Sequence, residues 1–255
     1  RDSVKRISNR SISANRKRNI FIVLTIVLAS ALLSAIVLYG FGVMQETQNR
    51  NQKTAQIMYH AISEQQGQEL YKQEEIAWVG EFFNAFSEQV NHSTVNFTYA
   101  NADMLTSQSM PYSGDLPASE NEIVVQESFL DSLGYSNELG QTIQIPFSDG
   151  TTHDFKLTGI LDVKTGDIGR YTAIISKELV RQQYGDGGMI DYYIGLKGAQ
   201  NMSEEEATNY ANTLAQQLKI SDDNVIVRST YFNLKDKNHG SDMPVSYTHL
   251  TLPTT

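Results

Sequence analysis

One uncharged stretch, from Ile20 to Gln45, constrains this chain more than any other feature of its sequence. Residues 20–42 read IFIVLTIVLASALLSAIVLYGFG. As an α-helix they would be roughly 35 Å long, which exceeds the ~30 Å hydrocarbon core of a bilayer. We therefore predict a transmembrane helix over residues 20–44. A cleaved signal peptide is the alternative, but its apolar region runs only about 7 to 15 residues.

Few polar side chains interrupt this stretch. Their hydroxyls can bond to carbonyls of the same helix or of a neighbouring one, and three small residues would allow close helix contacts. The hydroxyl residues are Thr25, Ser30 and Ser34, and the small residues are Ala29, Ala31 and Ala35. Partner helices in the membrane are compatible with this composition.

The charges of the chain are distributed unevenly around the apolar stretch. Residues 1–19 contain seven Lys or Arg and one Asp, whereas residues 20–255 contain thirteen basic and twenty-eight acidic side chains. Arg16, Lys17 and Arg18 directly precede the stretch, and Glu46 follows it. Because basic residues stay on the cytoplasmic side, we predict that residues 1–19 are cytoplasmic and that the main domain is extracytoplasmic. This acidic main domain argues against broad nucleic-acid binding.

The basic segment 1–19 has two interpretations. Its apolar positions Val4, Ile7 and Ile12 alternate with basic residues, which would suit a short amphipathic helix on the inner leaflet. A solvated tail that only sets the topology explains the same residues equally well.

Motifs for catalysis or metal binding are missing from this sequence. It contains no cysteine, so disulfides, thiolate catalysis and Cys-ligated metals are excluded. It has no phosphate-binding GxxxxGK[ST] loop and no GxSxG nucleophile motif, and its five histidines form no HExxH or HxxxH pair. The acidic runs 204–206 and 222–223 suit a helix start and a turn better than acid–base catalysis. We predict no catalytic, cofactor-binding or metal-binding residue.

Two strand–helix–strand units are predicted in the main domain. In the first, residues 54–61 form a strand, Ser63 and Gln66 make a capping box for a helix to about residue 74, and residues 76–86 form a second strand. The aromatic side chains of this second strand favour core packing over a lipid- or peptide-binding surface. In the second unit, strands 189–196 and 224–228 flank a helix that starts with a capping box at Ser203 and Glu206.

A β-rich segment lies between the two units. Residues 122–126 predict a strand, and residues 127–133 predict a helix that ends at Gly134 in the left-handed conformation. Alternation in residues 143–147 and 155–157 around the turn 148–151 predicts a hairpin. Residues 172–176 predict one more strand, followed by a helix to about Tyr184.

The resulting fold class is α+β: one N-terminal transmembrane helix with a stalk, then a mixed α/β extracytoplasmic domain of two βαβ-like units bracketing a β-rich insert. We assign 1–19 to a cytoplasmic segment, 20–44 to the membrane helix, 45–53 to the stalk and 54–243 to the extracytoplasmic domain. Within that domain, 54–100 and 185–235 contain the two βαβ-like units, and 101–184 are the β-rich insert. Residues 244–255 lack charge and periodicity, and we expect them to be a non-native tail of a gene fragment.

Four segments of the main domain share the pattern of a known family. In order they are residues 114–125 (GDLPASENEIVV), 133–134 (LG), 139–143 (LGQTI) and 155–160 (FKLTGI). Together with the membrane helix, they resemble the MacB/FtsX-type permease family of ABC transporters, over residues 3–235. The residues that define the resemblance are Gly114, Leu116, Pro117, Asn121, Glu122, Gly134, Gly140 and Gly159.

The resemblance implies a permease subunit without enzymatic activity or cofactor. It also implies that residues 54–100 and 185–235 form a porter-like part of the extracytoplasmic domain, with 101–184 as the β-rich insert. A cytoplasmic ABC ATPase subunit would hydrolyse ATP, a second permease subunit would complete a dimer, and three further membrane helices would follow the domain. The stroke that reaches the extracytoplasmic domain would expel peptides, antibiotics or lipoproteins, or activate wall hydrolases. A rigid stalk is required for this, and Gly40 and Gly42 are its expected hinge.

Two other functions are compatible with the sequence. A single-pass sensor or adaptor would have an external binding domain and one membrane helix, but only 19 residues would be available for signalling in the cytoplasm. A membrane-anchored extracellular enzyme would need a catalytic constellation, which the sequence does not offer.

Overall fold

The computed structural model describes residues 16–163, 170–185 and 190–233. It divides the chain into two compact units, residues 1–50 and 51–255, and each unit is described by itself. The second unit is called the head. The basic residues 1–15 and the expected non-native tail 244–255 lie outside the described residues.

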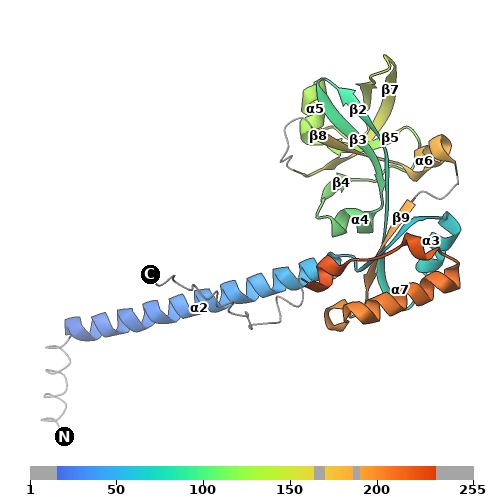
Figure 1. The fold of residues 1–255 in the computed structure, drawn as a ribbon. Coiled ribbons are helices and arrows are strands. Elements are labelled where there is room, and N and C mark those ends of the chain that lie inside the picture. The colour runs from blue at the N-terminus through green and yellow to red at the C-terminus, as the bar shows by residue number, and fades with distance from the viewer. Residues whose placement is uncertain (1–15, 164–169, 186–189, 234–255) are drawn as a thin grey trace, which may run out of the picture. The chain divides into compact units, whose positions relative to one another are not determined.

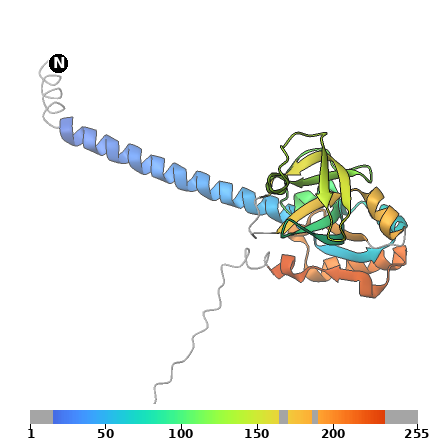
Figure 2. The same cartoon turned by 90° about the horizontal axis from the view of Figure 1, so that it is seen from above.

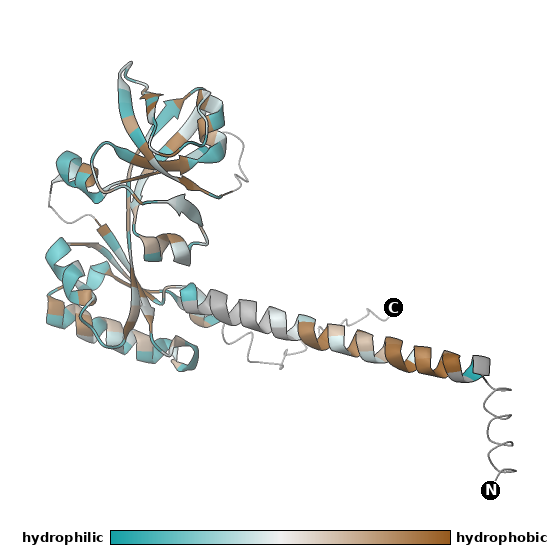
Figure 3. Cartoon of the chain, turned by 180° about the vertical axis from the view of Figure 1, so that it is seen from behind, coloured by the Kyte–Doolittle hydropathy of each residue, from teal (hydrophilic) through white to brown (hydrophobic). Residues whose placement is uncertain are grey.

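The described part of the first unit belongs to one helix, α2 (Arg16–Lys53), whose last three residues fall in the second unit. Its segment Ile20–Gly40 is long and apolar enough to cross a membrane, and none of the segment is buried by protein. In Figure 3 the apolar colour runs along most of this segment, as expected for a helix surrounded by lipid. The Thr25 hydroxyl donates to the carbonyl of Phe21 at 2.8 Å, and Ser30 donates likewise to Ile26. The hydroxyls of Thr25 and Ser30 are therefore satisfied by the helix itself.

Four strands and two helices of the head form one lobe. Along the chain they are β1 (Ile57–Ile62), α3 (Glu64–Leu70), β2 (Ile76–Val90), β9 (Ile190–Leu196), α7 (Glu204–Leu218) and β10 (Val225–Val227). The sheet order is β10-β1-β9-β2, and β9 is antiparallel to both β1 and β2. Each βαβ unit is therefore split by a strand of the other unit, which is the ferredoxin-like arrangement. We call this part the split-βαβ lobe.

The core of the split-βαβ lobe lies between its sheet and its helices. In Figure 2, α7 (orange) runs along one face of the sheet. The buried face of α7 consists of small and branched residues, Ala207, Ala211, Leu214 and Ala215, at helical spacing. Tyr59 on β1 is fully buried and donates to the Ala211 carbonyl at 3.0 Å, which joins α7 to the sheet.

The other lobe of the head, the insert lobe, is mostly β-structure (Figure 1). Its elements are β3 (Ser93–Ala100), α4 (Ala102–Ser107), β4 (Tyr112–Gly114), β5 (Glu122–Gln126), α5 (Glu127–Leu133), β6 (Thr142–Pro146), β7 (Thr152–Leu161), β8 (Arg170–Ile175) and α6 (Lys177–Tyr184). Strand order is β3-β8-β5-β7-β4, with β6 paired to β7. Its largest core cluster includes Phe97, Ile123, Phe129 and Ile145.

Strand β2 connects the two lobes. Its first part pairs with β9 from Ile76 to Phe82, and its second part pairs with β3 from Phe82 to Val90. The pairing with β3 has an irregularity between Asn84 and Phe86. A bulge of this kind bends a strand and increases its twist. In β2 it follows directly after Phe82, where the strand changes partner.

The predicted fold class is confirmed by this architecture. Both capping boxes are present, at Ser63 and at Ser203, and α5 ends at Gly134 with φ of 80°. The aromatic side chains of β2 are packed, for example Phe86 stacked on Phe97 with ring centroids 4.6 Å apart. Sequence patterns missed β3, α4 and β4, and the second strand extends beyond Phe86 to Val90. The division into domains at residues 100 and 185 stays a prediction.

The tight turn between β2 and β3 provides a first testable prediction. Asn91 and His92 have φ of 48° and 68°, and Val90 pairs with Ser93, so the turn has two residues in the left-handed region. Asn-Gly is the preferred sequence for such a turn. Replacing His92 by Gly should raise the free energy of unfolding by about 0.5–1 kcal/mol. Urea unfolding monitored by circular dichroism would show a higher midpoint, and an unchanged or lower midpoint would contradict the assignment.

Candidate functional site

The motif glycines Gly114 and Gly159 face each other across β4 and β7. Gly114 has φ of 82°, and a Cβ atom on Gly159 would lie 2.6 Å from the Ser113 carbonyl oxygen. Only glycine permits such a close approach of two backbones. These two motif residues are therefore explained by strand packing.

The acidic motif residue Glu122 fastens the turn that precedes β5. Its carboxylate accepts hydrogen bonds from the backbone N–H groups of Ala118 at 2.9 Å and Ser119 at 3.2 Å, and Lys156 lies 3.5 Å away. These bonds outweigh the effect of burial and lower the pKa of Glu122. The neighbouring Asn121 accepts a backbone bond from Lys156 at 2.7 Å. Both residues thus hold the motif segment against β7.

Two further motif glycines occupy turns. Gly140 has φ of 86° and donates its N–H to the Leu157 carbonyl at 2.7 Å, so it also lies against β7. Gly134 ends α5 and does not share in these contacts. The basic residues Arg16, Lys17 and Arg18 begin α2 in the other unit. Their proposed role in topology stays a prediction.

A polar cluster that the sequence analysis did not identify lies where the two lobes meet. Its centre is Glu81 on β2, whose side chain is only 5% exposed. The Glu81 carboxylate accepts from the hydroxyls of Tyr71 at 2.8 Å and Tyr99 at 2.6 Å, and the Lys177 Nζ lies 2.9 Å from it. The sequence contains one indication of this cluster, because Glu81 is an acidic residue within the apolar run 76–86.

A second carboxylate joins this cluster from the split-βαβ lobe. Glu64, in the first turn of α3, lies 3.0 Å from the Lys177 Nζ. Arg181, one turn further along α6, pairs with both oxygens of Glu64. Lys177 and Arg181 belong to the insert lobe, so these ion pairs connect the two lobes. We call Glu64, Tyr71, Glu81, Tyr99, Lys177 and Arg181 the junction cluster.

Burial and charge shift the ionisation of the junction cluster. Burial, followed by the charge of Glu81 and a hydrogen bond to it, raises the pKa of Tyr99 and of Tyr71 well above the usual range. Both phenols therefore stay protonated and donate. Burial disfavours the charged form of Glu64, but its hydrogen bonds with Arg181 and Lys177 and their positive charges outweigh this and lower its pKa.

Asn101 couples the cluster to α4. Its side chain accepts from the N–H of Met104 at 2.9 Å, as an N-cap does, and from the N–H of Glu81 at 3.0 Å. Its amide nitrogen donates to the Val79 carbonyl at 2.8 Å. A single side chain thus ties the start of α4 to β2 beside Glu81.

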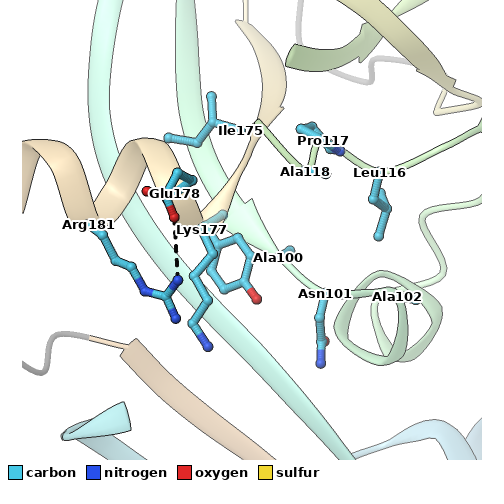
Figure 4. A pocket seen from close by; sticks show the side chains of 11 residues that line it. Ala100, Asn101, Ala102, Leu116, Pro117, Ala118, Ile175, Lys177, Glu178 and Arg181 are labelled. Atoms are coloured by element: carbon cyan, nitrogen blue, oxygen red, sulfur yellow. Dashed lines mark hydrogen bonds and ion pairs between the residues drawn. The ribbon is translucent and has the colours of Figure 1, made fainter. Parts of the chain in front are cut away.

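A cavity of about 260 Å³ lies beside the cluster. Figure 4 shows Lys177 and Arg181 extending from α6 in the same direction, with the motif residues Leu116 and Pro117 on the opposite wall. Asn101 and Glu178 add polar groups to the lining. Since Lys177 and Arg181 already pair with carboxylates, this arrangement favours packing and positioning over acid–base chemistry.

Within the described part of the chain, no group of three or more His, Asp or Glu side chains could hold a metal ion. Of the acidic run 204–206, Glu206 completes the capping box of α7. The candidate site in the described part of the head is therefore the junction cluster, to which both lobes contribute charged side chains.

Comparison with known protein families decides what this head is. A model of the MacB-like periplasmic core domain matches residues 20–228. The chain belongs to this family. The matched region includes both α2 and the two lobes of the head, and members of the family are components of ABC transporter permeases and not themselves enzymes. ABC transporters of this kind work with cytoplasmic ATPases.

Solved structures with a similar fold come from other bacteria. A domain described as part of a permease protein from Porphyromonas gingivalis is 8% identical with a TM-score of 0.50, covering 68% of this chain and 86% of that one. The periplasmic region of MacB from Actinobacillus actinomycetemcomitans is 12% identical with a TM-score of 0.49, covering 73% and 93%. The extracellular domain of the ABC-type transporter YknZ from Gram-positive bacteria is 9% identical with a TM-score of 0.49, covering 69% and 100%. No curated protein sequence matches the chain.

The lowered pKa of Glu64 gives a prediction about pH. A carboxylate whose pKa is lower in the folded state stabilises that state above its unfolded pKa of about 4.3, and this stabilisation is lost as the pH falls. Replacing Glu64 by Gln should therefore lower the free energy of unfolding by about 1 kcal/mol at pH 6, a value that allows for the partial exposure of the pair. The difference between the two proteins should shrink as the pH falls below about 4.3.

The control for this prediction removes the partner of Glu64. In an Arg181→Gln background, the effect of Glu64→Gln at pH 6 should be smaller, and its dependence on pH weaker. Unfolding by urea at a series of pH values would measure all four proteins. An effect of Glu64→Gln that grows as the pH falls would contradict the assigned ion pairs.

Proposed function

We propose that this chain supplies the first membrane helix and the extracytoplasmic head of an ABC transporter permease subunit. Residues 1–19 would lie in the cytoplasm, α2 would cross the membrane, and the head would lie outside. A cytoplasmic ATPase would hydrolyse ATP, and a second permease subunit would complete the complex. The observation that supports this most strongly is the family match over residues 20–228, which includes the apolar helix and the head together.

The proposed activity is mechanical. ATP-dependent movement of the membrane helices would reach the head through α2, and the head would act on an extracytoplasmic substrate or partner. Peptides, antibiotics and lipoproteins are the substrate classes that fit a head outside the membrane, and control of a wall hydrolase is the other possibility of this kind. The helical continuity of α2 from Arg16 to Lys53 supports transmission, because a continuous helix carries force better than a flexible linker.

The orientation can be tested because the sequence contains no cysteine. Single cysteines would be introduced at Ser3, before the helix, and at Asp131, which is exposed on α5. In intact cells, a membrane-impermeant maleimide should label Asp131→Cys and not Ser3→Cys, and lysis should expose both. Labelling of Ser3→Cys in intact cells would reject the proposed topology.

Coupling to an ATPase needs a separate experiment. The full chain, carrying an affinity tag, would be purified from native membranes in mild detergent and assayed for ATP hydrolysis. We expect a copurifying ABC ATPase, identified by mass spectrometry, and hydrolysis that vanadate inhibits. Since this sequence has no GxxxxGK[ST] motif, activity in the absence of any copurifying ATPase would contradict the proposal.

A further inference from the structure

The bend of β2, at residues 82–86, lies where this strand passes from one lobe to the other. At Phe82 the strand exchanges its partner, pairing with Asp191 of β9 and with Ala100 of β3. The irregularity between Asn84 and Phe86 follows at once. Irregular pairing leaves fewer ladder hydrogen bonds to resist bending than a regular sheet provides.

Helix α6 is attached to β2 before this bend and within it. At its first residue, the Lys177 Nζ lies 2.9 Å from Glu81, just before Phe82. At its last residue, the Tyr184 hydroxyl donates to the Ala85 carbonyl at 2.8 Å, within the irregular segment. The Tyr184 ring also packs edge-on against Phe83, with ring centroids 5.2 Å apart.

The same face of α6 also holds the other lobe. Lys177, Arg181 and Tyr184 are spaced i, i+4 and i+7, so they lie on one side of the helix. Lys177 and Arg181 both pair with Glu64, in the first turn of α3 in the split-βαβ lobe. A single short helix therefore contacts β2 before the bend, β2 within the bend, and the helix α3 of the neighbouring lobe.

We propose that α6 is a splint that fixes the angle between the two lobes of the head. Its three anchors are the side chains of Lys177, Arg181 and Tyr184, which differ in how far they are exposed to solvent. The Lys177 anchor is nearly buried, whereas Arg181 is 39% exposed and Tyr184 is also exposed. Loss of the outer anchors should free the bend without unfolding either lobe, because the core clusters of the lobes consist of other residues.

This inference does not depend on the proposed transport function, since it concerns contacts within the head alone. It assigns to α6 the role of holding the two lobes of the head at one angle. A partner or a movement that separated α6 from Glu64 would release the bend in β2. The lobe angle would then be the quantity that changes, with the lobes themselves intact.

The experiment measures the distance between the lobes in the full chain. Because the sequence lacks cysteine, spin labels can be placed specifically at Asp131→Cys on α5 and Asn212→Cys on α7, both exposed. Pulsed electron resonance in detergent micelles would give the distribution of distances between the two labels. We expect one narrow peak for the unmodified head, and a broader or shifted distribution for Tyr184→Phe, Arg181→Gln and Lys177→Met.

Matched controls separate the splint from general effects of the substitutions. Tyr135→Phe removes a hydroxyl that accepts from the Gln144 N–H within the insert lobe, and Lys72→Gln removes an ion pair with Glu69 within the split-βαβ lobe. Neither control should change the distance distribution. Lobe integrity would be checked by far-ultraviolet circular dichroism.

The distance distributions of the anchor variants and the controls decide whether α6 sets the lobe angle. Broadening in the anchor variants, with both controls unchanged, supports the splint. Should Lys177→Met fail to fold, Tyr184→Phe and Arg181→Gln remain informative, because both side chains are partly exposed. If these two variants fold and keep the unmodified distribution, both singly and combined, α6 does not set the lobe angle and the proposal is wrong.

Discussion

Replacing Lys177 by Met should lower the free energy of unfolding of the head by about 3 kcal/mol, the largest effect expected of any side chain in the junction cluster. The Lys177 ammonium is 18% exposed, and it pairs with Glu81, which is 5% exposed. Removing the cation leaves a buried carboxylate whose charge is no longer balanced. The hydroxyls of Tyr71 and Tyr99 still donate to Glu81, but two neutral donors do not replace a positive charge.

The measurement uses the only tryptophan of the chain. Trp78 lies on β2 in the head, so its fluorescence during urea unfolding of the full chain in detergent reports on the head. Lys72→Gln, which removes an exposed ion pair, should change the free energy of unfolding by no more than about 0.5 kcal/mol.

A double substitution tests the physical cause of this effect. If the cost arises from the unbalanced charge of Glu81, then Lys177→Met combined with Glu81→Gln should be less destabilising than Lys177→Met alone. The amide of Gln can still accept a hydrogen bond from a tyrosine hydroxyl. A double variant that is as unstable as the sum of the two single variants would contradict the proposed cause.

Local features of the fold could be predicted from sequence because their causes are local. Ser63 with Gln66, and Ser203 with Glu206, are three residues apart and satisfy the free N–H groups of the same helix end. Gly134 ends α5 because it adopts a positive φ without strain. Each of these features depends on residues within about one helical turn of each other, so the local sequence is enough to predict it.

The junction cluster was missed for the opposite reason. Glu81 and Lys177 are separated by 96 residues, and Glu64 and Arg181 by 117. Their contact depends on β2 leaving one lobe for the other and on α6 lying along the bend. Neither the periodicity of β2 nor that of α6 specifies this pairing, although an acidic residue in a buried strand indicates that a partner must exist.

The motif residues illustrate an intermediate case. Gly114 and Gly159 were identified from their pattern, and glycine is the residue that permits a close approach of two backbones. The structure adds that the two glycines approach one another, through antiparallel pairing of β4 and β7. A pattern in a single sequence identifies such positions without indicating their partners.

Replacing Gly67 by Ala should destabilise the head by about 2–3 kcal/mol, although the same change in an ordinary helix interior stabilises by about 1 kcal/mol. Gly67 lies within α3 and is buried against the ring of Tyr192 on β9. An added Cβ would overlap this ring, and Tyr192 is fully buried, so the ring has no space to move. Helix propensity alone would raise the free energy of unfolding, whereas overlap with the Tyr192 ring lowers it, so the direction of the change distinguishes the two causes.

A compensating substitution shows whether the overlap with the ring is the cause. Tyr192→Leu removes the ring atoms that an alanine at residue 67 would meet, so Gly67→Ala should cost much less in that background than in the unmodified head. Urea unfolding followed by Trp78 fluorescence would compare the four proteins of this cycle. Because α3 also carries Glu64, a head that tolerated Gly67→Ala without loss of stability would mean that α3 does not pack on β9 as described, and the ion pairs between the lobes would then need a different geometry.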